Sequence, residues 1–232
     1  MNVQQLSFQY KRKTVLEQLT FSIPQGQIVG LIGENGSGKS TLLKLMAGIL
    51  TPTSGRLELN GEKVTRRHTN KIAYLPDIDL FYEKLTGEEV FKFYESQFED
   101  FSSEKAREVA SFLQVPTTVK LGNISKGNRG RIKLATFLGR NVELYLMDEP
   151  FAGLDPLARE SLLKAIIKFI DTENSAIVLS THEVNEVEPI LDEVMLLKDG
   201  HLCAMEVVED IRHERGEDTV NWMKNLYEKR VR

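Results

Sequence analysis

Residues 33–40 read Gly33-Glu34-Asn35-Gly36-Ser37-Gly38-Lys39-Ser40, which fits the pattern G-x-x-x-x-G-K-[ST] at every fixed position. In this pattern, glycines allow backbone N–H groups to turn inward around phosphate oxygens, and the following helix adds the positive end of its dipole. Lys39 is expected to reach the β- and γ-phosphates, and the Ser40 hydroxyl is expected to bind Mg²⁺. The residues therefore predict a phosphate-binding loop.

The alternative for residues 33–40 is a glycine-rich turn without a chemical role. The motif requires a strand before it and a helix after it. Residues 27–32 form a short apolar run, typical of a strand covered on both faces. Residues 41–50 carry leucine, methionine and isoleucine at helical spacing. Both flanks match the required context, which favours the phosphate loop.

Apolar runs typical of strands and apolar residues at helical spacing recur through the rest of the chain. Strands are expected over residues 3–10, 19–23, 27–32, 56–59, 72–75, 144–147, 176–179 and 194–197. Helices are expected over residues 41–50, 156–170, 183–191 and 218–227, with a mostly helical block from 86 to about 140. The pair Asn60-Gly61 is a hairpin signal. Strands alternating with helices indicate an α/β fold with a mainly parallel sheet.

The composition limits the classes of function. A formal net charge of −4 and a sequence pI near 5.7 argue against a dedicated nucleic-acid binder. Cys203 is the single cysteine and cannot form an internal disulfide, which fits a reducing compartment. The N-terminus shows no signal-peptide pattern. No apolar run approaches the roughly 20 residues of a membrane helix, so work at a membrane would require a partner.

A second polar anchor follows the predicted strand at residues 144–147, where the chain continues Asp148-Glu149-Pro150. Mg²⁺ prefers oxygen ligands, often through water, so Asp148 is expected near the metal. Neighbouring strand residues point to opposite sides unless the strand is ending. Glu149 is therefore expected to have a separate role, on the attacking water. The alternative is two solvated acids at a strand end, which the phosphate loop makes the weaker interpretation.

Between these anchors, residues 124–131 read Ile-Ser-Lys-Gly-Asn-Arg-Gly-Arg and precede a predicted helix. This segment resembles the signature sequence of ATP-binding cassette (ABC) ATPases in its S-x-G form. Further motifs of that family follow in the family's order. Residues 152–155 resemble its D-loop, His182 stands at its histidine position, and Tyr10 stands where it has an adenine-stacking aromatic. The resemblance extends from about residue 3 to residue 202.

The resemblance implies a single ABC ATPase domain over residues 1–232 with the α/β P-loop NTPase fold. A three-layer core with a mainly parallel sheet and an N-terminal antiparallel β subdomain is expected in residues 1–76 and 141–206. An inserted helical subdomain is expected over about 77–140, and a C-terminal helical tail over 207–232.

The resemblance also implies a site for ATP and Mg²⁺. The catalytic residues are expected to be Glu149, His182 and Lys39, and the metal ligands Ser40, Asp77 and Asp148. The residues implied to bind ATP are Tyr10, Gly33, Asn35, Gly36, Ser37, Gly38, Lys39, Ser40, Thr41, Ser125 and Gly127.

Each weaker motif also has a purely structural interpretation. Tyr10 can fill a strand edge, although an aromatic face also suits adenine. Ser125 is a good helix N-cap, as is Asp155 before Pro156, and both roles are compatible with the functional ones. His182 can be a surface histidine at a strand end, but its position in the motif order favours contact with the γ-phosphate.

Asp77 departs from the family pattern. It follows the predicted strand at 72–75 and Pro76, where the family usually carries a glutamine. Aspartate also binds a hard cation through oxygen, but it is shorter and brings a negative charge near the phosphates. The alternative is a simple turn residue after proline.

The resemblance implies the ATPase subunit of a membrane transporter. Two cassettes, as a homodimer or heterodimer, are expected to hold two ATP molecules between the phosphate loop of one and the signature of the other. A separate transmembrane permease subunit is expected to dock near residues 77–94, with the run 80–82 suited to its coupling helix. The chain is then expected to be cytoplasmic, on the inner face of the cell membrane.

Two other functions compete with this interpretation. A soluble cassette ATPase acting on DNA or ribosomes usually carries long insertions or two cassettes, which this chain lacks, so no nucleic acid is expected. A small-molecule kinase leaves the signature and His182 unexplained. The Ser-Lys-Gly signature and the short single cassette favour export over import. The transported substrate has no direct sign in the sequence.

Overall fold

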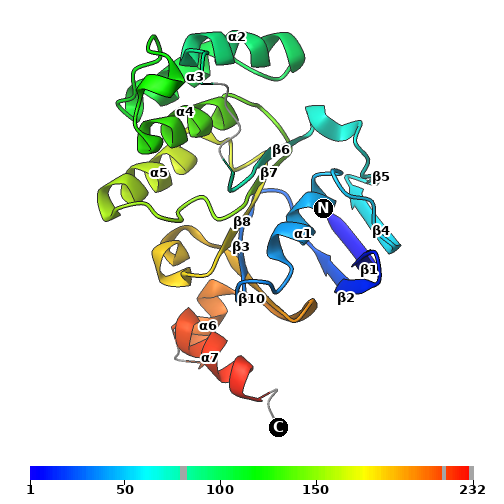
Figure 1. The fold of residues 1–232 in the computed structure, drawn as a ribbon. Helices are drawn as coiled ribbons and strands as arrows, with labels where there is room; N and C mark the ends of the chain where they lie inside the picture. The colour runs from blue at the N-terminus through cyan, green and yellow to red at the C-terminus, as the bar shows by residue number, and fades with distance from the viewer. Residues whose placement is uncertain (79–82, 216–217, 230–232) are drawn as a thin grey trace.

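The strands of the chain form two sheets, which Figure 1 shows with a helical block above them. The structure is a computed structural model that describes residues 1–78, 83–215 and 218–229. The run 80–82, predicted to meet a partner, lies outside these residues.

The smaller sheet is antiparallel, with strand order β2-β1-β4-β5. Its strands are β1 (Asn2–Tyr10), β2 (Lys13–Ser22), β4 (Ser54–Leu59) and β5 (Glu62–Lys63). The predicted hairpin turn joins β4 to β5, where Asn60 has a φ of 50° and Gly61 a φ of 82°. Two left-handed residues in a two-residue loop match the twist of the flanking strands.

The larger sheet has strand order β10-β9-β3-β8-β7-β6. Its strands are β3 (Ile28–Ile32), β6 (Ile72–Leu75), β7 (Leu144–Met147), β8 (Ala176–Thr181), β9 (Glu193–Lys198) and β10 (His201–Val207). All neighbours pair in parallel except β9 and β10, which form an antiparallel pair. The carboxyl ends of β3, β6, β7 and β8 therefore meet at one edge, where ligands bind in open α/β sheets.

Both faces of the larger sheet are covered, as the sequence predicted for strands that are apolar throughout. On β7, Leu144 and Leu146 face α1 and the antiparallel sheet, whereas Tyr145 and Met147 face α4 and α5. The chain therefore folds as an α/β protein of three layers. The helices are α1 (Lys39–Met46), α2 (Gly87–Gln97), α3 (Ser103–Phe112), α4 (Lys126–Leu138), α5 (Pro156–Phe169), α6 (Val208–Arg215) and α7 (Thr219–Lys229).

The inserted block begins with a strong helix start signal. Thr86 caps α2, because its hydroxyl accepts from the N–H of Glu89 at 3.2 Å while the Glu89 carboxylate accepts from the Thr86 N–H at 2.8 Å. This reciprocal pair is the capping box. Helices α2, α3 and α4 lie together at the upper left of Figure 1. The predicted helical block is thus confirmed, whereas the domain boundaries at residues 77, 141 and 207 stay a prediction.

The predicted helix over residues 183–191 is wrong. Two short 3₁₀-helices stand there, η3 (Val184–Glu186) and η4 (Glu188–Ile190). Pro189 has no backbone N–H and its ring clashes with the preceding turn, so it kinks or breaks an α-helix at a cost of about 3 kcal/mol. The predicted strands are present and α6 lies within the expected helical tail, but β10 was not expected.

The C-terminal helix packs back onto this 3₁₀ segment. Trp222 is buried in the same cluster as Val184 and Val187, and Arg212 of α6 donates to Glu188 at 2.7 Å. This confirms that the tail helix has an apolar side.

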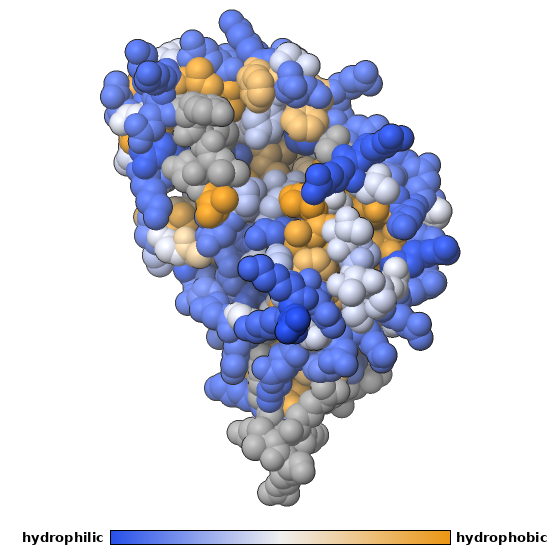
Figure 2. All heavy atoms as spheres, turned by 45° about the vertical axis from the view of Figure 1, so that its right-hand side comes forward, coloured by the Kyte–Doolittle hydropathy of each residue, from blue (hydrophilic) through white to orange (hydrophobic). Residues whose placement is uncertain are grey.

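Within residues 1–78, 83–215 and 218–229, no helix has the length and apolar character that crossing a membrane requires. The face seen in Figure 2 is mostly hydrophilic, with hydrophobic residues over its upper part and near its middle.

Candidate active site

The phosphate loop joins the end of β3 to the start of α1, and its course requires glycine. Gly36 has a φ of 87° and Gly38 a φ of 110°, which residues with a side chain rarely adopt. A Cβ atom at Gly33 would lie 2.3 Å from the carbonyl oxygen of Leu197. The fixed glycines of the motif are therefore needed for the backbone itself.

Both sheets hold the loop in place. The N–H of Gly200, in the turn between β9 and β10, donates to the Ser37 carbonyl at 3.1 Å, and the Glu17 N–H of β2 donates to the Gly200 carbonyl at 2.9 Å. A Cβ atom at Gly38 would lie 2.6 Å from Cδ2 of Leu16. The loop is thus positioned by the antiparallel sheet on one side and the central sheet on the other.

The start of α1 offers donors to an anion. The helix begins at Lys39, and Gly38 has no side chain to cap the N–H groups of the first turn, which also contains Thr41. Asn35 is exposed, whereas Ser37 Oγ is buried and has no hydrogen-bond partner among the described residues. Unpaired donors at a helix N-terminus favour a phosphate. The residues present therefore fit the phosphates of a nucleotide.

Lys39 reaches back across this loop. Its Nζ donates to the carbonyl oxygens of Gly33 at 2.6 Å and Glu34 at 3.2 Å, and it lies 3.4 Å from Oε1 of Glu149. The side chain is 6% exposed, so these oxygen atoms, rather than water, stabilise its positive charge. A fixed positive charge thus stands inside the loop, where the motif predicts it.

Asp148 follows β7 directly, and three hydroxyls surround its buried carboxylate. Oδ1 accepts from Ser40 Oγ at 2.9 Å and from Ser180 Oγ at 3.0 Å, and Oδ2 accepts from Tyr74 Oη at 3.1 Å. These bonds compensate for the burial of the carboxylate. Burial, followed by the charge of Asp148, raises the pKa of the Tyr74 hydroxyl above its ordinary value.

The pair of Ser40 and Asp148 presents hard oxygen atoms of the kind that Mg²⁺ prefers. In the described ranges, no group of three or more His, Cys, Asp or Glu side chains is placed to hold a metal ion. A cation at this pair needs further oxygen ligands, and nucleotide phosphates can provide them. The residues therefore fit Mg²⁺ that arrives with a nucleotide.

Glu149 lies beside Asp148 despite the alternation of strand side chains. The strand β7 ends at Met147, and Glu149 has a left-handed φ of 47°. Its N–H donates to Ser180 Oγ at 2.9 Å. This turn directs the Glu149 carboxylate to Lys39, so the two acids lie at one site through different contacts.

His182 follows β8 and contacts Glu149. Its Nδ1 lies 2.8 Å from Glu149 Oε2. A carboxylate can only accept, so the hydrogen bond requires the proton on Nδ1. The His182 side chain is 43% exposed, so the ring is accessible from solvent. A continuous line of contacts therefore runs from Lys39 through Glu149 to His182.

The signature residues lie apart from this cluster. Ser125 caps α4, with its Oγ accepting from the N–H of Asn128 at 3.2 Å, and both Ser125 and Gly127 are exposed. Among the described residues, no hydrogen bond or ion pair joins residues 125–127 to the phosphate loop. In Figure 1, α4 belongs to the helical block whereas α1 stands beside the antiparallel sheet.

Three further predicted residues lie at the surface. Tyr10 ends β1 and is 47% exposed, with its ring edge-to-face on Phe8 at 4.8 Å. Asp77 is exposed just after β6. Asp155 caps α5, because its Oδ1 accepts two first-turn N–H groups at 3.0 Å each. The N-cap role predicted for Asp155 is confirmed.

Tyr74 and Ser180 are site residues that the sequence analysis missed. Tyr74 is the polar residue of the predicted strand 72–75, and Ser180 directly follows the predicted strand 176–179, so a hydroxyl in or just after an apolar run is the signal that could have identified them. In the sheet, β6 and β8 are the two neighbours of β7. Hydroxyls near the carboxyl ends of both neighbours therefore converge on Asp148.

Comparison with known proteins adds an independent finding. The family described as ABC transporter matches residues 16–152. An uncharacterized ABC transporter ATP-binding protein of Methanocaldococcus jannaschii is 32% identical, over 91% of this chain and 79% of that protein. A lantibiotic transport ATP-binding protein of Streptococcus pyogenes is 30% identical, over 87% and 88%. The solved structure of an ATP binding subunit of an ABC transporter is 29% identical, covers 100% of this chain and 99% of that chain, and has a TM-score of 0.84.

Proposed function

The chain belongs to the ABC transporter family of ATP-binding proteins, and from that premise we propose that the residues around Lys39 and Asp148 form its ATP-hydrolysing site. Members of this family are ATPases. The observation that carries the proposal is the line of contacts from Lys39 through Glu149 to His182, beside the Ser40–Asp148 pair.

The phosphate loop binds the phosphates of ATP through its backbone N–H groups and through Lys39. The α1 N-terminus, the left-handed glycines and the buried Ser37 hydroxyl support this role. Tyr10 stacks on the adenine, a role that its exposed ring supports. Ser40, Asp148 and Asp77 hold Mg²⁺, which when bound neutralises charge on the phosphate oxygens.

Glu149 acts as the general base for the attacking water. Its carboxylate is placed by two neighbours, Lys39 at 3.4 Å and His182 at 2.8 Å. Such a base takes the proton that the water loses as it attacks the γ-phosphate. His182 holds the base through Nδ1 and offers its exposed face to the phosphate. Catalysis then consists of positioning and electrostatic stabilisation, as in phosphoryl transfer generally.

A second cassette completes the nucleotide site with its own signature. Ser125 and Gly127 sit at an exposed helix N-terminus, which suits a phosphate that arrives on another chain. The second cassette is a second copy or a related ATPase. ATP binding closes the two cassettes, and hydrolysis allows them to open.

The membrane partner is a separate permease subunit, and the chain works on the inner face of the cell membrane. Two large exposed hydrophobic side chains support docking near the start of the helical block, Ile78 at 60% and Phe93 at 56% exposed.

The transport that the chain powers is export rather than import. The relative named for lantibiotic transport supports this direction.

The proposal is tested with the purified chain and Mg²⁺-ATP. Phosphate release is measured over a hundredfold range of protein concentration. If two cassettes form each site, the rate per molecule rises with concentration until the dimer saturates. A rate per molecule that is constant over the whole range would contradict the two-cassette site. Absence of phosphate release at every concentration would contradict the ATPase site itself.

Co-purification in detergent tests the membrane partner. A tag on this chain is expected to recover an integral membrane protein in a fixed ratio. The matched control is the same chain with Ile78 and Phe93 replaced by Ser, which removes two exposed hydrophobic side chains without touching the phosphate loop. Equal recovery with both chains would contradict docking at this surface.

A further inference from the structure

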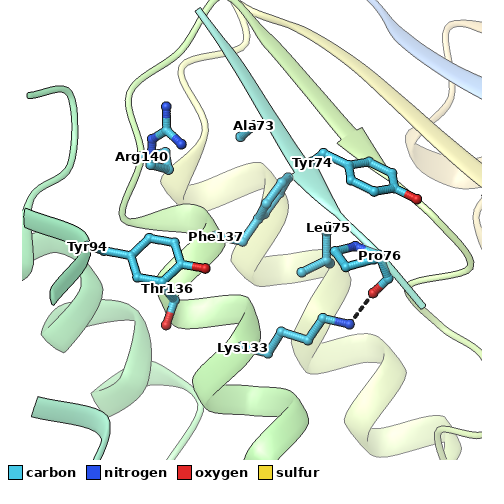
Figure 3. A pocket seen from close by; sticks show the side chains of 9 residues that line it. All are labelled: Ala73, Tyr74, Leu75, Pro76, Tyr94, Lys133, Thr136, Phe137 and Arg140. Atoms are coloured by element: carbon cyan, nitrogen blue, oxygen red, sulfur yellow. Dashed lines mark hydrogen bonds between the residues drawn. The ribbon is translucent and has the colours of Figure 1, made fainter. Parts of the chain in front are cut away.

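The strand β6 presents different side chains to its two faces. Ala73 and Leu75 belong to the cluster that packs against the helices, where a cavity of about 70 Å³ lies between β6, α2 and α4. Tyr74 packs with the opposite cluster. Figure 3 shows its ring extending from β6 on the side away from Phe137, and its hydroxyl lies at the far end of the ring. The Tyr74 hydroxyl therefore belongs to the β7 edge of the site rather than to the cavity.

That hydroxyl is the donor to one particular oxygen of Asp148. Tyr74 Oη donates to Oδ2 at 3.1 Å, whereas the two serine hydroxyls both donate to Oδ1. Asp148 is only 4% exposed, so water contributes little to fixing its orientation. Donors from α1 and β8 hold one oxygen, and a donor from β6 holds the other. Because each oxygen has its own donors, these hydrogen bonds fix the orientation of the Asp148 carboxylate plane.

Resting on the proposed function, we infer that Tyr74 is a positioning residue for the metal site, because it fixes the orientation in which Asp148 meets Mg²⁺. A tyrosine suits this task because its ring has only two rotatable bonds and stands on a strand. Hydrogen bonds from such outer groups to a metal-binding carboxylate change metal affinity by about 10- to 100-fold when they are removed. Tyr74 also lies three residues before Asp77, so the other proposed metal residue follows directly after the end of the same strand.

The test compares two tyrosine hydroxyls that lie on neighbouring strands. Tyr74→Phe removes the donor to Asp148. Tyr145→Phe is the matched control, because it removes a buried hydroxyl that donates to the Arg140 carbonyl at 2.6 Å, on the opposite face of the sheet. Binding of Mn²⁺ to the ADP-saturated protein is measured by electron paramagnetic resonance. The affinity for ADP without metal is measured in EDTA. A normal value shows that the phosphate loop of the variant is folded.

We expect Tyr74→Phe to weaken Mn²⁺ binding about tenfold and Tyr145→Phe to leave it within twofold. Metal-free ADP affinity should be unchanged in both. Adding Tyr74→Phe to Asp148→Asn should cause no further loss of Mn²⁺ affinity, because the hydroxyl acts through the carboxylate.

Two results would overturn the inference while leaving the ATPase proposal intact. In one, the parent binds Mn²⁺-ADP and hydrolyses ATP, and Tyr74→Phe matches it. In the other, both tyrosine variants lose Mn²⁺ affinity equally, which would mean a general effect on packing. A parent chain that binds no ADP would instead overturn the proposed function, and this inference with it.

Discussion

The N-termini of α1 and α4 have similar chemistry but very different surroundings. At α1, the side chains of Lys39 and Asp148 are enclosed by their own chain, whereas residues 34–36 of the phosphate loop are exposed. Lys39, Asp148 and Glu149 are joined to neighbours at 2.6 to 3.4 Å. At α4, Ser125 caps the helix and is otherwise exposed. In the proposed two-cassette site, a single chain would provide the buried contacts of the phosphate-loop side. Its signature side would be an exposed helix start that another molecule can approach.

Replacing Lys39 by Ala tests the enclosed side and should have the largest effect. Removing one member of a buried charge contact costs about 2–5 kcal/mol, so ATP affinity should fall at least about 30-fold, and hydrolysis should be lost with it. Calorimetry with Mg²⁺-ATP gives the affinity. Lys44→Ala, farther along α1, is the matched control and should bind normally. Equal affinity in Lys39→Ala and the parent would remove the phosphate-loop role.

Glu149→Gln separates binding from hydrolysis on the same side. The amide holds a water but cannot take its proton, so the rate should fall about 100- to 10,000-fold while ATP still binds. ATP should then keep two cassettes together, which size-exclusion chromatography with ATP detects. Glu173→Gln, in an exposed loop, is the control. Turnover at the parent's rate would exclude Glu149 as the base, and a variant that stays monomeric would count against the two-cassette site.

Ser125→Ala tests the exposed side. The substitution removes a helix cap worth about 1 kcal/mol and a donor to the partner's phosphate, so hydrolysis should fall about 100-fold. ATP affinity at low protein concentration should stay within twofold, since Ser125 is apart from its own chain's phosphate loop. Ser102→Ala removes the equivalent cap of α3 and should lose stability only. If both serine variants hydrolyse ATP equally, Ser125 is a cap and nothing more.

Asp77 should show the smallest effect because it is exposed. An exposed charge contributes about 0.5–1 kcal/mol, which is a two- to fivefold change. Asp77→Asn should weaken the dependence of hydrolysis on Mg²⁺, Asp77→Gln should keep or raise activity, and Asp77→Ala should lower activity more than binding. The measurement is the ATPase rate against Mg²⁺ concentration. Three curves that superimpose on the parent's would leave Asp77 a turn residue.

The local signals in the sequence were sufficient for most of the fold. Apolar runs predicted the buried strands, and the glycine pattern predicted the loop, because both depend on neighbours in the chain. The helix expected over 183–191 failed where Pro189 interrupts a periodic pattern. The contacts of Tyr74 and Ser180 with Asp148 were not predictable from periodicity. They depend on strand order, since β6 and β8 flank β7 only in the folded sheet.

The left-handed backbone of Glu149 has a consequence for how this protein can change over generations. A non-glycine residue in that conformation costs about 1–2 kcal/mol, and glycine would avoid most of it. Glycine would, however, also remove the carboxylate that Lys39 and His182 contact at 3.4 and 2.8 Å, and losing one member of a buried charge contact costs about 2–5 kcal/mol. The contacts therefore outweigh the strain, and selection for heat resistance keeps the glutamate as selection for turnover does. A relative with glycine at this position would have lost a stabilising contact together with the proposed base.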